Sequence, residues 1–472
     1  MSKTSDILSI LKSYSYKNTE KGIFVYIDTA NGREEVPVKS DIFYSIIADD
    51  YQRHTEGKTV CVKTIKDCIF NFSGSIIRTQ PKVSTRLRVN MAQDGSIIRI
   101  DIGDNEYRYI KITDEGWTIE NDGDNYFTHH TRQAPMPIPT HGGDITKIFK
   151  YCRVTKEMET VFIAYVCSCF IDIIHPCLVI QGKAGSSKST MSKFLKMIVD
   201  ASVNNAPCIF PKNEREIKDV YNTNYFVAYD NLQKITNRQS DCLCSIVTGT
   251  QDIRRKLFTN FETCTTDLRQ PIALNGIRNI IANEDMMERS IILELQPIAS
   301  SEKKSERKLM IDFQKDLPDI LGGIMDILSK TLSTYKADTI SNPPRLVDFY
   351  EYGYYICEAW EKGQGAEFCA DYTLLVEKQL KKFSHKTDFI ELVKMFLEDE
   401  DNEFHGTMSE LWDKLRDYEE LANSEGLVPG SANRLSRELR QHRSDFEDNG
   451  IYIEFSRTPS NLCYVKISLE DE

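Results

Sequence analysis

One run of small residues constrains the fold of this chain more than any other feature. Residues 182–190 read Gly-Lys-Ala-Gly-Ser-Ser-Lys-Ser-Thr, which fits the spacing G-x-x-x-x-G-K-[ST] except that Ser187 stands at the last glycine. An apolar strand candidate at 177–180 precedes the run, and a helical pattern at 191–199 follows it. Strand, small-residue loop and helix form the setting of a P-loop, whose backbone N–H groups and helix N-terminus bind phosphate oxygens. The sequence therefore predicts a nucleotide site.

Every residue of the run is a candidate contact for the nucleotide. Lys188 is placed to reach the β- and γ-phosphates, and the Ser189 hydroxyl is placed to bind Mg²⁺. A serine at position 187 is small enough for a crowded loop, so this departure from the motif is slight. The alternative is a glycine- and serine-rich turn that binds nothing. We expect ATP or GTP, with Mg²⁺, on Gly182, Lys183, Ala184, Gly185, Ser186, Ser187, Lys188, Ser189 and Thr190.

A second motif lies at residues 225–231, an apolar strand candidate that ends in Asp230. In P-loop ATPases an aspartate at such a strand end holds the Mg²⁺ water shell. A motor ATPase usually has a glutamate next, which orients the attacking water, and here Asn231 takes that place. Either Asn231 positions the water without acting as a base, or another carboxylate does this work. An aspartate that merely ends a strand is the alternative for Asp230.

Two more polar residues follow apolar patterns. Asn275 ends the strand candidate at 270–276, where P-loop ATPases with an additional strand hold a residue that hydrogen-bonds the lytic water. Arg289 ends a short helix candidate before the strand at 291–295, where ring ATPases place an arginine that enters the neighbouring subunit's site. The alternatives are an Asn-Gly turn for Asn275 and a surface ion pair with Glu284 or Glu288 for Arg289.

Composition limits the class of protein. The 13 cysteines are scattered without CxxC spacing, which fits neither a zinc site nor a disulfide framework and favours reduced thiols in the cytoplasm. The first residues show an amphipathic pattern, so no signal peptide is expected, and the most apolar stretch, 161–174, is too short to span a bilayer. We expect no membrane partner. The net charge of −12 argues against general DNA coating, so any nucleic-acid contact needs a local basic surface.

The patterns divide the chain into five parts of an α/β protein. The N-terminal part holds a helix candidate at 41–53 and hairpin strands at 96–102 and 107–112. The last part holds helix candidates at 388–398, 409–421 and 431–443, followed by two alternating strands, which is the order of a winged helix. The expected parts are a mixed α+β domain (1–133), a linker (134–142), a P-loop ATPase core (143–299), a helical lid (300–383) and a winged-helix-like domain (384–472).

With these motifs in place, the chain resembles the AAA+ ATPases related to superfamily-3 and MCM-like helicases. It is similar in particular to a bacterial family of replication helicase/ATPase proteins carried by phages, plasmids and genomic islands. The resemblance covers most of the chain and implies a homo-oligomeric ring, a hexamer or a similar ring, that hydrolyses ATP to move along single-stranded or forked DNA. The matching phrases are residues 94–103, 116–117, 182–190, 229–232, 248–249, 269–277, 288–290 and 344–349.

The last of these phrases gives Arg345 a role. By the resemblance, Arg345 is a sensor arginine that reaches from the helical lid to the γ-phosphate of the nucleotide. A helix start capped by a proline explains the same residues and stays open as the alternative.

Two local surfaces are candidates for DNA contact. Arg254, Arg255 and Lys256 lie between the Asp230 and Asn275 motifs, where ring helicases carry a pore hairpin that grips phosphates. Arg434, Arg437 and Arg440 lie on the third helix candidate of the last domain. The alternatives are a solvated charge run for the first surface and a protein-binding module for the second.

The leading interpretation is an ATP-dependent DNA helicase or translocase that acts in replication of a mobile genetic element. The first alternative is a signalling or defence ATPase that senses nucleic acid without unwinding it. The second is an initiator or helicase loader that uses ATP as a switch, and a small-molecule kinase is the third. The N-terminal region shows no zinc-ligand set, so primase activity is not expected.

Overall fold

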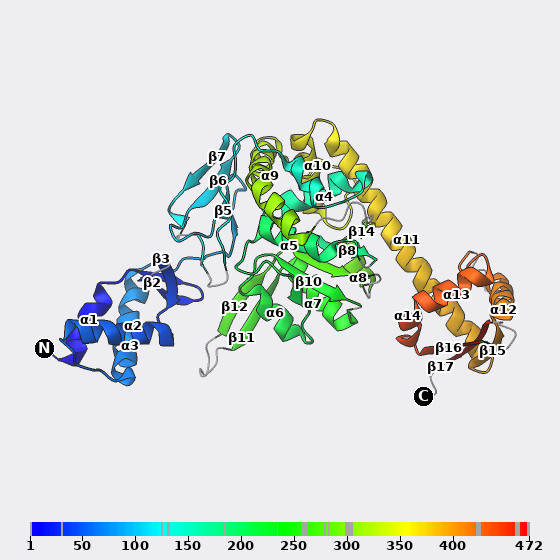
Figure 1. The fold of residues 1–472 in the computed structure, drawn as a ribbon, viewed down its shortest axis with the longest axis horizontal. Coiled ribbons are helices and arrows are strands. Elements are labelled where there is room, and N and C mark those ends of the chain that lie inside the picture. Colours follow the sequence, from blue (N-terminus) through cyan, green and yellow to red (C-terminus); the bar gives the residue numbers. More distant parts are fainter. Residues whose placement is uncertain are drawn as a thin grey trace. The chain divides into compact units, whose positions relative to one another are not determined.

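The architecture is taken from a computed structural model of the chain (Figure 1). The chain forms two compact units, Met1–Leu375 and Val376–Glu472, and each is described by itself. At 252–255, 263–267, 457 and 463 the description is of the backbone alone. The described residues are 2–29, 32–123, 126–129, 133–183, 185–233, 235–255, 263–277, 280–281, 283–297, 305–421, 426–457 and 463–469.

The first unit begins with a small α+β region that has its own core. Its antiparallel sheet has the order β1-β2-β3, and three helices pack beside it through buried residues such as Ile7, Phe43 and Ile65. The Ser40 hydroxyl accepts from the Phe43 N–H at 3.2 Å and starts the helix predicted at 41–53. The elements are α1 (Lys3–Lys12), β1 (Tyr16–Thr19), β2 (Gly22–Thr29), β3 (Gly32–Pro37), α2 (Asp41–His54) and α3 (Val62–Thr79).

A second antiparallel sheet follows, with the order β4-β5-β6-β7. Its strands are β4 (Val89–Met91), β5 (Ile98–Asp101), β6 (Tyr109–Thr113) and β7 (Gly116–Glu120). The isoleucines that alternate along β5 and β6 are buried, because successive side chains of a strand point to opposite faces. The hairpin predicted at 96–112 is confirmed, and β7 pairs with β6 as its continuation.

The described core of the unit holds a five-stranded parallel sheet with the order β14-β8-β13-β10-β9. The central strands are nearly continuous apolar runs, as expected for strands that are covered on both faces. β13 comes late in the chain but lies between β8 and β10. The strands are β8 (Cys177–Gly182), β9 (Cys208–Ile209), β10 (Val227–Leu232), β13 (Ile272–Gly276) and β14 (Ser290–Leu295).

Helices and one inserted ribbon surround this sheet (Figure 1). The ribbon consists of β11 (Thr250–Arg255) and β12 (Thr263–Leu268), which pair antiparallel between α7 and β13. The helices before and between the strands are η2 (Ile145–Lys150), η3 (Lys156–Met158), α4 (Glu159–Ser168), α5 (Lys188–Val199), α6 (Glu214–Tyr221), α7 (Asn237–Thr248) and α8 (Glu284–Glu288).

The helix α9 (Glu306–Thr334) holds the segment before the core in place. Thr140 N–H donates to the carbonyl of Pro318 at 3.0 Å, and Gly142 N–H donates to Asp326 Oδ2 at 3.0 Å. A Cβ on Gly322 would lie 1.8 Å from the Thr140 carbonyl oxygen, so only glycine allows this approach. Two more helices follow, α10 (Val347–Trp360) and α11 (Gln364–Asp399).

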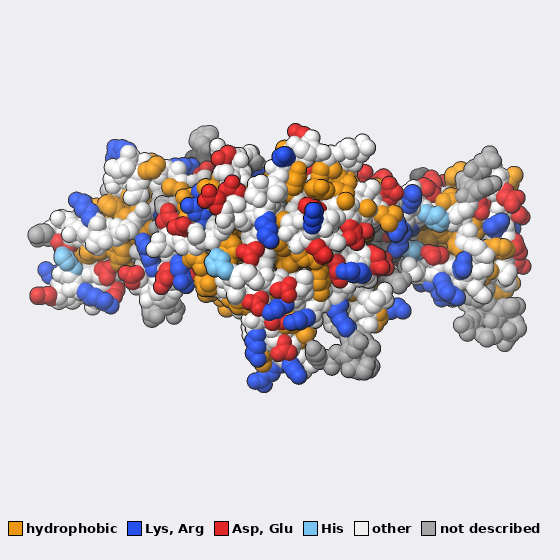
Figure 2. Space-filling model, turned by 90° about the horizontal axis from the view of Figure 1, so that it is seen from above, with side chains coloured by type: hydrophobic (Ala, Val, Ile, Leu, Met, Phe, Trp, Pro, Cys, Tyr) orange, Lys and Arg blue, Asp and Glu red, His pale blue; other side chains and the backbone are white. Residues whose placement is uncertain are grey.

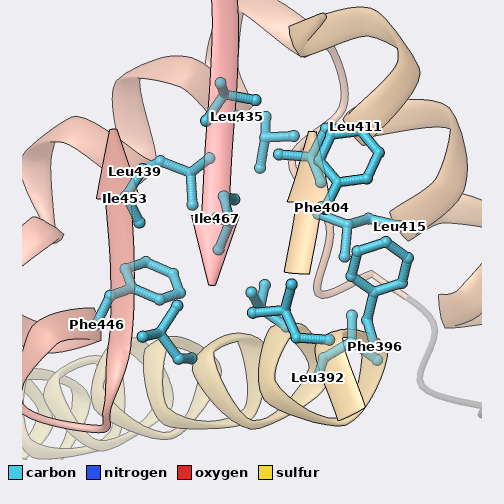
Figure 3. Close-up of a cluster of buried hydrophobic side chains, with 14 of the residues drawn as sticks. Leu392, Phe396, Phe404, Leu411, Leu415, Leu435, Leu439, Phe446, Ile453 and Ile467 are labelled. Atoms are coloured by element: carbon cyan, nitrogen blue, oxygen red, sulfur yellow. The ribbon is translucent and has the colours of Figure 1, made fainter. Parts of the chain in front are cut away.

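The second unit has a helix–strand–helix–helix–helix–strand–strand order around one hydrophobic core (Figure 3). Its antiparallel sheet has the order β15-β17-β16. The Ser431 hydroxyl caps the helix predicted at 431–443, accepting from the Arg434 N–H at 3.4 Å. The elements after α11 are β15 (Glu403–Thr407), α12 (Met408–Leu421), α13 (Ala432–Gln441), α14 (Arg443–Glu447), β16 (Ile451–Arg457) and β17 (Cys463–Leu469).

One expectation for this region needs correction, and two of its elements are new. The helix predicted at 388–398 is the last part of α11, which runs unbroken from Gln364 because no proline and no later glycine interrupts it. β15 and the short α14 were not predicted. Among the described helices, none combines the length and the apolar character that a membrane span requires.

Candidate nucleotide site

The loop between β8 and α5 closes around its own lysine. Lys188 is the first residue of α5, and its Nζ donates to the carbonyls of Gly182 at 2.7 Å and Lys183 at 3.1 Å. Loss of water in the loop lowers the pKa of Lys188, while the nearby charge of Asp230 acts in the opposite direction. The ammonium group therefore lies inside the loop and near the acid that ends the second motif.

The backbone of the loop matches the demands of a phosphate cradle. Ser187 has φ +61° and ψ +28°, the left-handed conformation that costs a non-glycine residue about 1–2 kcal/mol. This is the position where the motif has glycine, so the geometry explains the consensus. A Cβ on Gly182 would lie 2.6 Å from the Leu295 carbonyl oxygen, which leaves no room for a side chain. Ala184 of the motif lies outside the described residues.

The sheet order brings the other candidate residues to the same edge. Asn275 in β13 lies opposite Ile180 in β8, and Leu274 lies opposite Tyr229 in β10. Because these strands are parallel, Asn275 and Asp230 end neighbouring strands beside the P-loop. Sequence motifs more than forty residues apart thus meet at one edge of the sheet.

The side chain of Asn275 provides the test of whether a nucleotide fits. Asn275 is 1% exposed, and among the described residues neither its Oδ1 nor its Nδ2 has a hydrogen-bond partner. A buried amide left in this state costs about 1–3 kcal/mol for each unsatisfied group. A donor and an acceptor beside a phosphate cradle match a phosphate oxygen and a water molecule. The residues therefore fit a bound nucleoside triphosphate.

The strand with Asp230 is irregular where the acid lies. Asn231 has φ +57°, its N–H donates to Asp230 Oδ1 at 2.8 Å, and the register shifts between Tyr229 and Leu232. Asparagine adopts this left-handed conformation more readily than glutamate does. The local backbone therefore gives a physical reason for the asparagine at this position.

A magnesium ion would have Asp230 and Ser189 as its protein ligands. Within the described ranges no three or more His, Cys, Asp or Glu residues lie together in an arrangement that could hold a metal. Mg²⁺ bound with a nucleotide does not need such a set, because water and phosphate oxygens supply most of its ligands. One carboxylate and one hydroxyl at the P-loop are therefore compatible with this ion.

Arg289 lies at the other edge of the sheet. Its carbonyl accepts from the Cys177 N–H at 2.7 Å, at the start of β8, whereas the P-loop follows the end of β8. Gly182 is five residue steps along the strand from Cys177, which is roughly 17 Å at about 3.3 Å per step. Arg289 donates to the Asp285 carbonyl at 2.8 Å and forms an ion pair with the Asp285 carboxylate.

Arg345 lies at this same edge and not at the P-loop of its own chain. Its Nη2 is 2.8 Å from Asp285 Oδ1, and its Nη1 pairs with Glu288. The hydrogen bond from Arg289 holds the pKa of Asp285 below its ordinary value, so this carboxylate stays charged. The expected reach of Arg345 to the γ-phosphate is therefore not the arrangement seen here. Sequence reasoning missed Asp285, although its place four residues before Arg289 is the spacing of a helical ion pair.

The first of the two basic surfaces lies on the β11–β12 ribbon. Arg254 and Arg255 lie in β11, paired through the backbone with Cys264 and Thr263, and Lys256 lies outside the described residues. Arg254 and Arg255 are thus the last two residues of a ribbon strand.

The arginines of α13 are exposed but not equivalent. Arg434 and Arg437 face solvent, and the guanidinium of Arg440 lies 3.7 Å from the centre of the Phe455 ring. Residues 376–472 contain 13 Lys and Arg against 22 Asp and Glu, so these arginines lie in an acidic unit. On the face drawn in Figure 2, basic and acidic side chains are interspersed.

Comparisons with known families agree with a replication protein of a mobile element. Residues 145–373 match a family model described as the actinomycete integrative conjugative element replication protein, and residues 389–472 match the AICE RepA C-terminal domain. No curated protein matches the chain.

Comparisons with solved structures give distant matches. An apo form of the NrS-1 C-terminal region is 11% identical with a TM-score of 0.40, over 98% of this chain and 99% of that one. A second apo structure of that region (305–718) is 12% identical with a TM-score of 0.39, over 99% and 100%. A complex of JCV helicase with an acetamide compound is 11% identical with a TM-score of 0.25, over 47% of this chain and 70% of that one. Over the two matched sequence ranges, the chain is similar to the replication proteins of actinomycete integrative conjugative elements.

Proposed function

We propose that this protein is an ATP-dependent DNA helicase or translocase of the AAA+ type that acts in replication of a mobile element. One observation carries the proposal: Lys188, Asp230 and the buried amide of Asn275, which has no hydrogen-bond partner within the described part of the chain, lie at one edge of the parallel sheet. The two family matches support the part of the proposal that concerns replication.

The residues of the site have separate roles in this proposal. The loop N–H groups and Lys188 bind the triphosphate, while Ser189 and Asp230 hold Mg²⁺. Bound Mg²⁺-ATP supplies a phosphoanhydride with a charged γ-phosphoryl group. Lys188 exchanges the carbonyls of Gly182 and Lys183 for phosphate oxygens, and Asn275 orients the water that attacks. The Asn231 amide is not basic, so it can position this water but cannot take its proton.

A ring explains the place of Arg289. An arginine at the far edge of the sheet cannot reach the P-loop of its own chain but can face the site of a neighbouring copy. An arginine delivered in this way stabilises the charge that develops on the transferred phosphoryl group. We therefore propose a homo-oligomeric ring, a hexamer, in which Arg289 acts on the next subunit after Asp285 releases it.

DNA is the proposed substrate, and two elements are proposed to contact it. In the chain order, the β11–β12 ribbon is inserted between the strand of Asp230 and the strand of Asn275. Movement of a DNA strand along this ribbon can therefore be coupled to the nucleotide cycle. The helix order and the β15-β17-β16 sheet of the second unit fit a winged helix, with α13 as the helix available to a groove. Arg434 and Arg437 are the phosphate contacts on α13.

A second candidate function is an initiator or loader that uses ATP as a switch. Asn231 in place of a base and an Arg289 held by Asp285 both favour slow hydrolysis, which suits a switch better than a motor. A defence ATPase that senses nucleic acid shares these features and remains an alternative.

The experiment compares ATP hydrolysis of the wild type and of Lys188→Ala, alone and with single-stranded DNA, and then measures strand displacement on a fork. Hydrolysis that DNA stimulates, that drives displacement and that Lys188→Ala abolishes supports the motor. Hydrolysis without displacement moves the assignment to the switch. Equal turnover in both proteins refutes the P-loop assignment.

A further inference from the structure

A fully buried arginine connects the N-terminal sheet to the nucleotide core. Arg88 lies directly before β4 and is 0% exposed. Its Nε donates to Asp200 Oδ1 at 3.1 Å, its Nη1 to the carbonyl of Asp101 at 3.0 Å and its Nη2 to the carbonyl of Ala201 at 2.9 Å. A guanidinium engaged in each of these directions is fixed in place, because its planar fork allows little rotation.

Asp200 receives this arginine and joins two elements of the nucleotide site. It follows the last residue of α5, and its Oδ2 accepts from Lys196 Nζ at 2.7 Å. The same oxygen accepts the N–H groups of Tyr225 at 2.8 Å and Phe226 at 3.1 Å, which lead directly into β10. Burial alone would raise the pKa of Asp200, but the charges of Lys196 and Arg88 bring it down to about 2. The carboxylate is therefore charged.

The opposite ends of α5 and β10 carry the residues that are proposed to meet the nucleotide. Lys188 begins α5, and Asp230 lies near the end of β10. The 12 residues of α5 span about 18 Å at 1.5 Å per residue, so a tilt of about 3° at Asp200 moves the P-loop end by about 1 Å. A displacement of this size at a reacting group can cost about 100-fold in rate.

Arg88 is the second cation at the Asp200 carboxylate. Lys196 pairs with Asp200 at 2.7 Å, and the buried guanidinium of Arg88 pairs with it at 3.1 Å. The other partners of Arg88 are backbone carbonyls, one from the N-terminal sheet and one from the residue after Asp200. The arginine therefore links these segments.

We propose that Arg88 and Asp200 are positioning residues that set the separation between the P-loop helix and the strand of Asp230, and that the N-terminal sheet acts on the nucleotide site through them. This inference rests on the proposed ATPase function. It predicts that losing the link changes catalysis more than nucleotide affinity, because the loop N–H groups and Lys188 bind the triphosphate locally.

The test compares Arg88→Met with Lys17→Met in the full chain. Lys17 is also a buried cation of the N-terminal region, but its partners, Glu35 at 3.1 Å and the Phe127 carbonyl at 2.5 Å, both belong to that region. Both variants should unfold at lower temperature than the wild type. Arg88→Met alone should lower kcat, by about tenfold or more, with the Kd of a non-hydrolysable ATP analogue within about threefold of the wild-type value.

Further measurements separate the link from general instability. Arg88→Lys keeps the charge but loses the planar fork of the guanidinium, so its kcat should fall as in Arg88→Met. A wild-type kcat in Arg88→Lys would overturn the proposal. Equal losses of kcat in the Lys17 and Arg88 variants would also overturn it. Hydrogen exchange at the Tyr225 and Phe226 amides does not depend on ATPase activity. Faster exchange there in the Arg88 variants than in Lys17→Met supports the link even if the ATPase assignment fails, and unchanged exchange refutes it.

Discussion

Replacing Ser187 by glycine should stabilise the P-loop. Ser187 has φ +61°, which costs a residue with a Cβ about 1–2 kcal/mol. Glycine avoids this strain but loses about 0.5–1 kcal/mol through its freer unfolded chain. Ser187→Gly should therefore raise the free energy of unfolding by about 0.5–1 kcal/mol, with little change in ATP affinity.

The matched control is Ser245→Gly, the same chemical change inside α7. Ser245 is exposed and its hydroxyl donates to the Asp241 carbonyl at 2.9 Å, so glycine there should destabilise by about 0.5–1 kcal/mol. Urea unfolding of the nucleotide-free proteins, and then calorimetry, measures the change in the free energy of unfolding of both variants. If Ser187→Gly destabilises as much as Ser245→Gly, the left-handed conformation of Ser187 is not the source of strain.

Three further predictions concern the ring, the DNA contact and the acid stability. Arg289→Ala should bind ATP without hydrolysing it, and mixing it with Lys188→Ala should restore some turnover, since mixed rings contain intact Lys188–Arg289 pairs; no recovery on mixing contradicts the trans role. Changing Arg434 and Arg437 to glutamine should weaken duplex DNA binding and flatten the slope of log K against log salt by about 0.9 for each lost contact, while basal ATP hydrolysis stays unchanged. Filter binding at several salt concentrations measures this slope, and an unchanged slope excludes α13 as a DNA contact. The pKa of Asp200 is depressed to about 2, so its ionised form adds about 2 kcal/mol to the free energy of unfolding above pH 4, and this contribution is lost as the pH falls towards 2. Asp200→Asn should therefore be less stable than the wild type at pH 7. In urea unfolding, the variant should lose less free energy of unfolding than the wild type between pH 5 and pH 2.

Local sequence patterns predict much of the fold. The P-loop, α2 and the β5–β7 strands are specified by residues that are close in sequence, so periodicity and capping chemistry predict them. The order of the core strands is a different matter. That β13 lies between β8 and β10 is set by packing among distant segments, and the motif spacing alone does not state it.

The side-chain partners were harder to foresee. Arg345 and Arg289 share Asp285 because a long connection returns to the edge of the sheet where α8 ends. Arg88 meets Asp200 across 112 positions, and nothing in the sequence around residue 88 indicates a buried ion pair. Such contacts depend on how separate sheets and helices dock, which a single sequence does not reveal.

The loop that holds its own lysine also affects which anions can enter it. The carbonyls of Gly182 and Lys183 solvate the Lys188 ammonium. A small free anion such as inorganic phosphate has to displace these dipoles with few contacts to offer in return. A triphosphate engages the lysine, the loop amides and the helix end together, so it offsets the loss. The geometry of the loop therefore favours a polyphosphate over a small free anion.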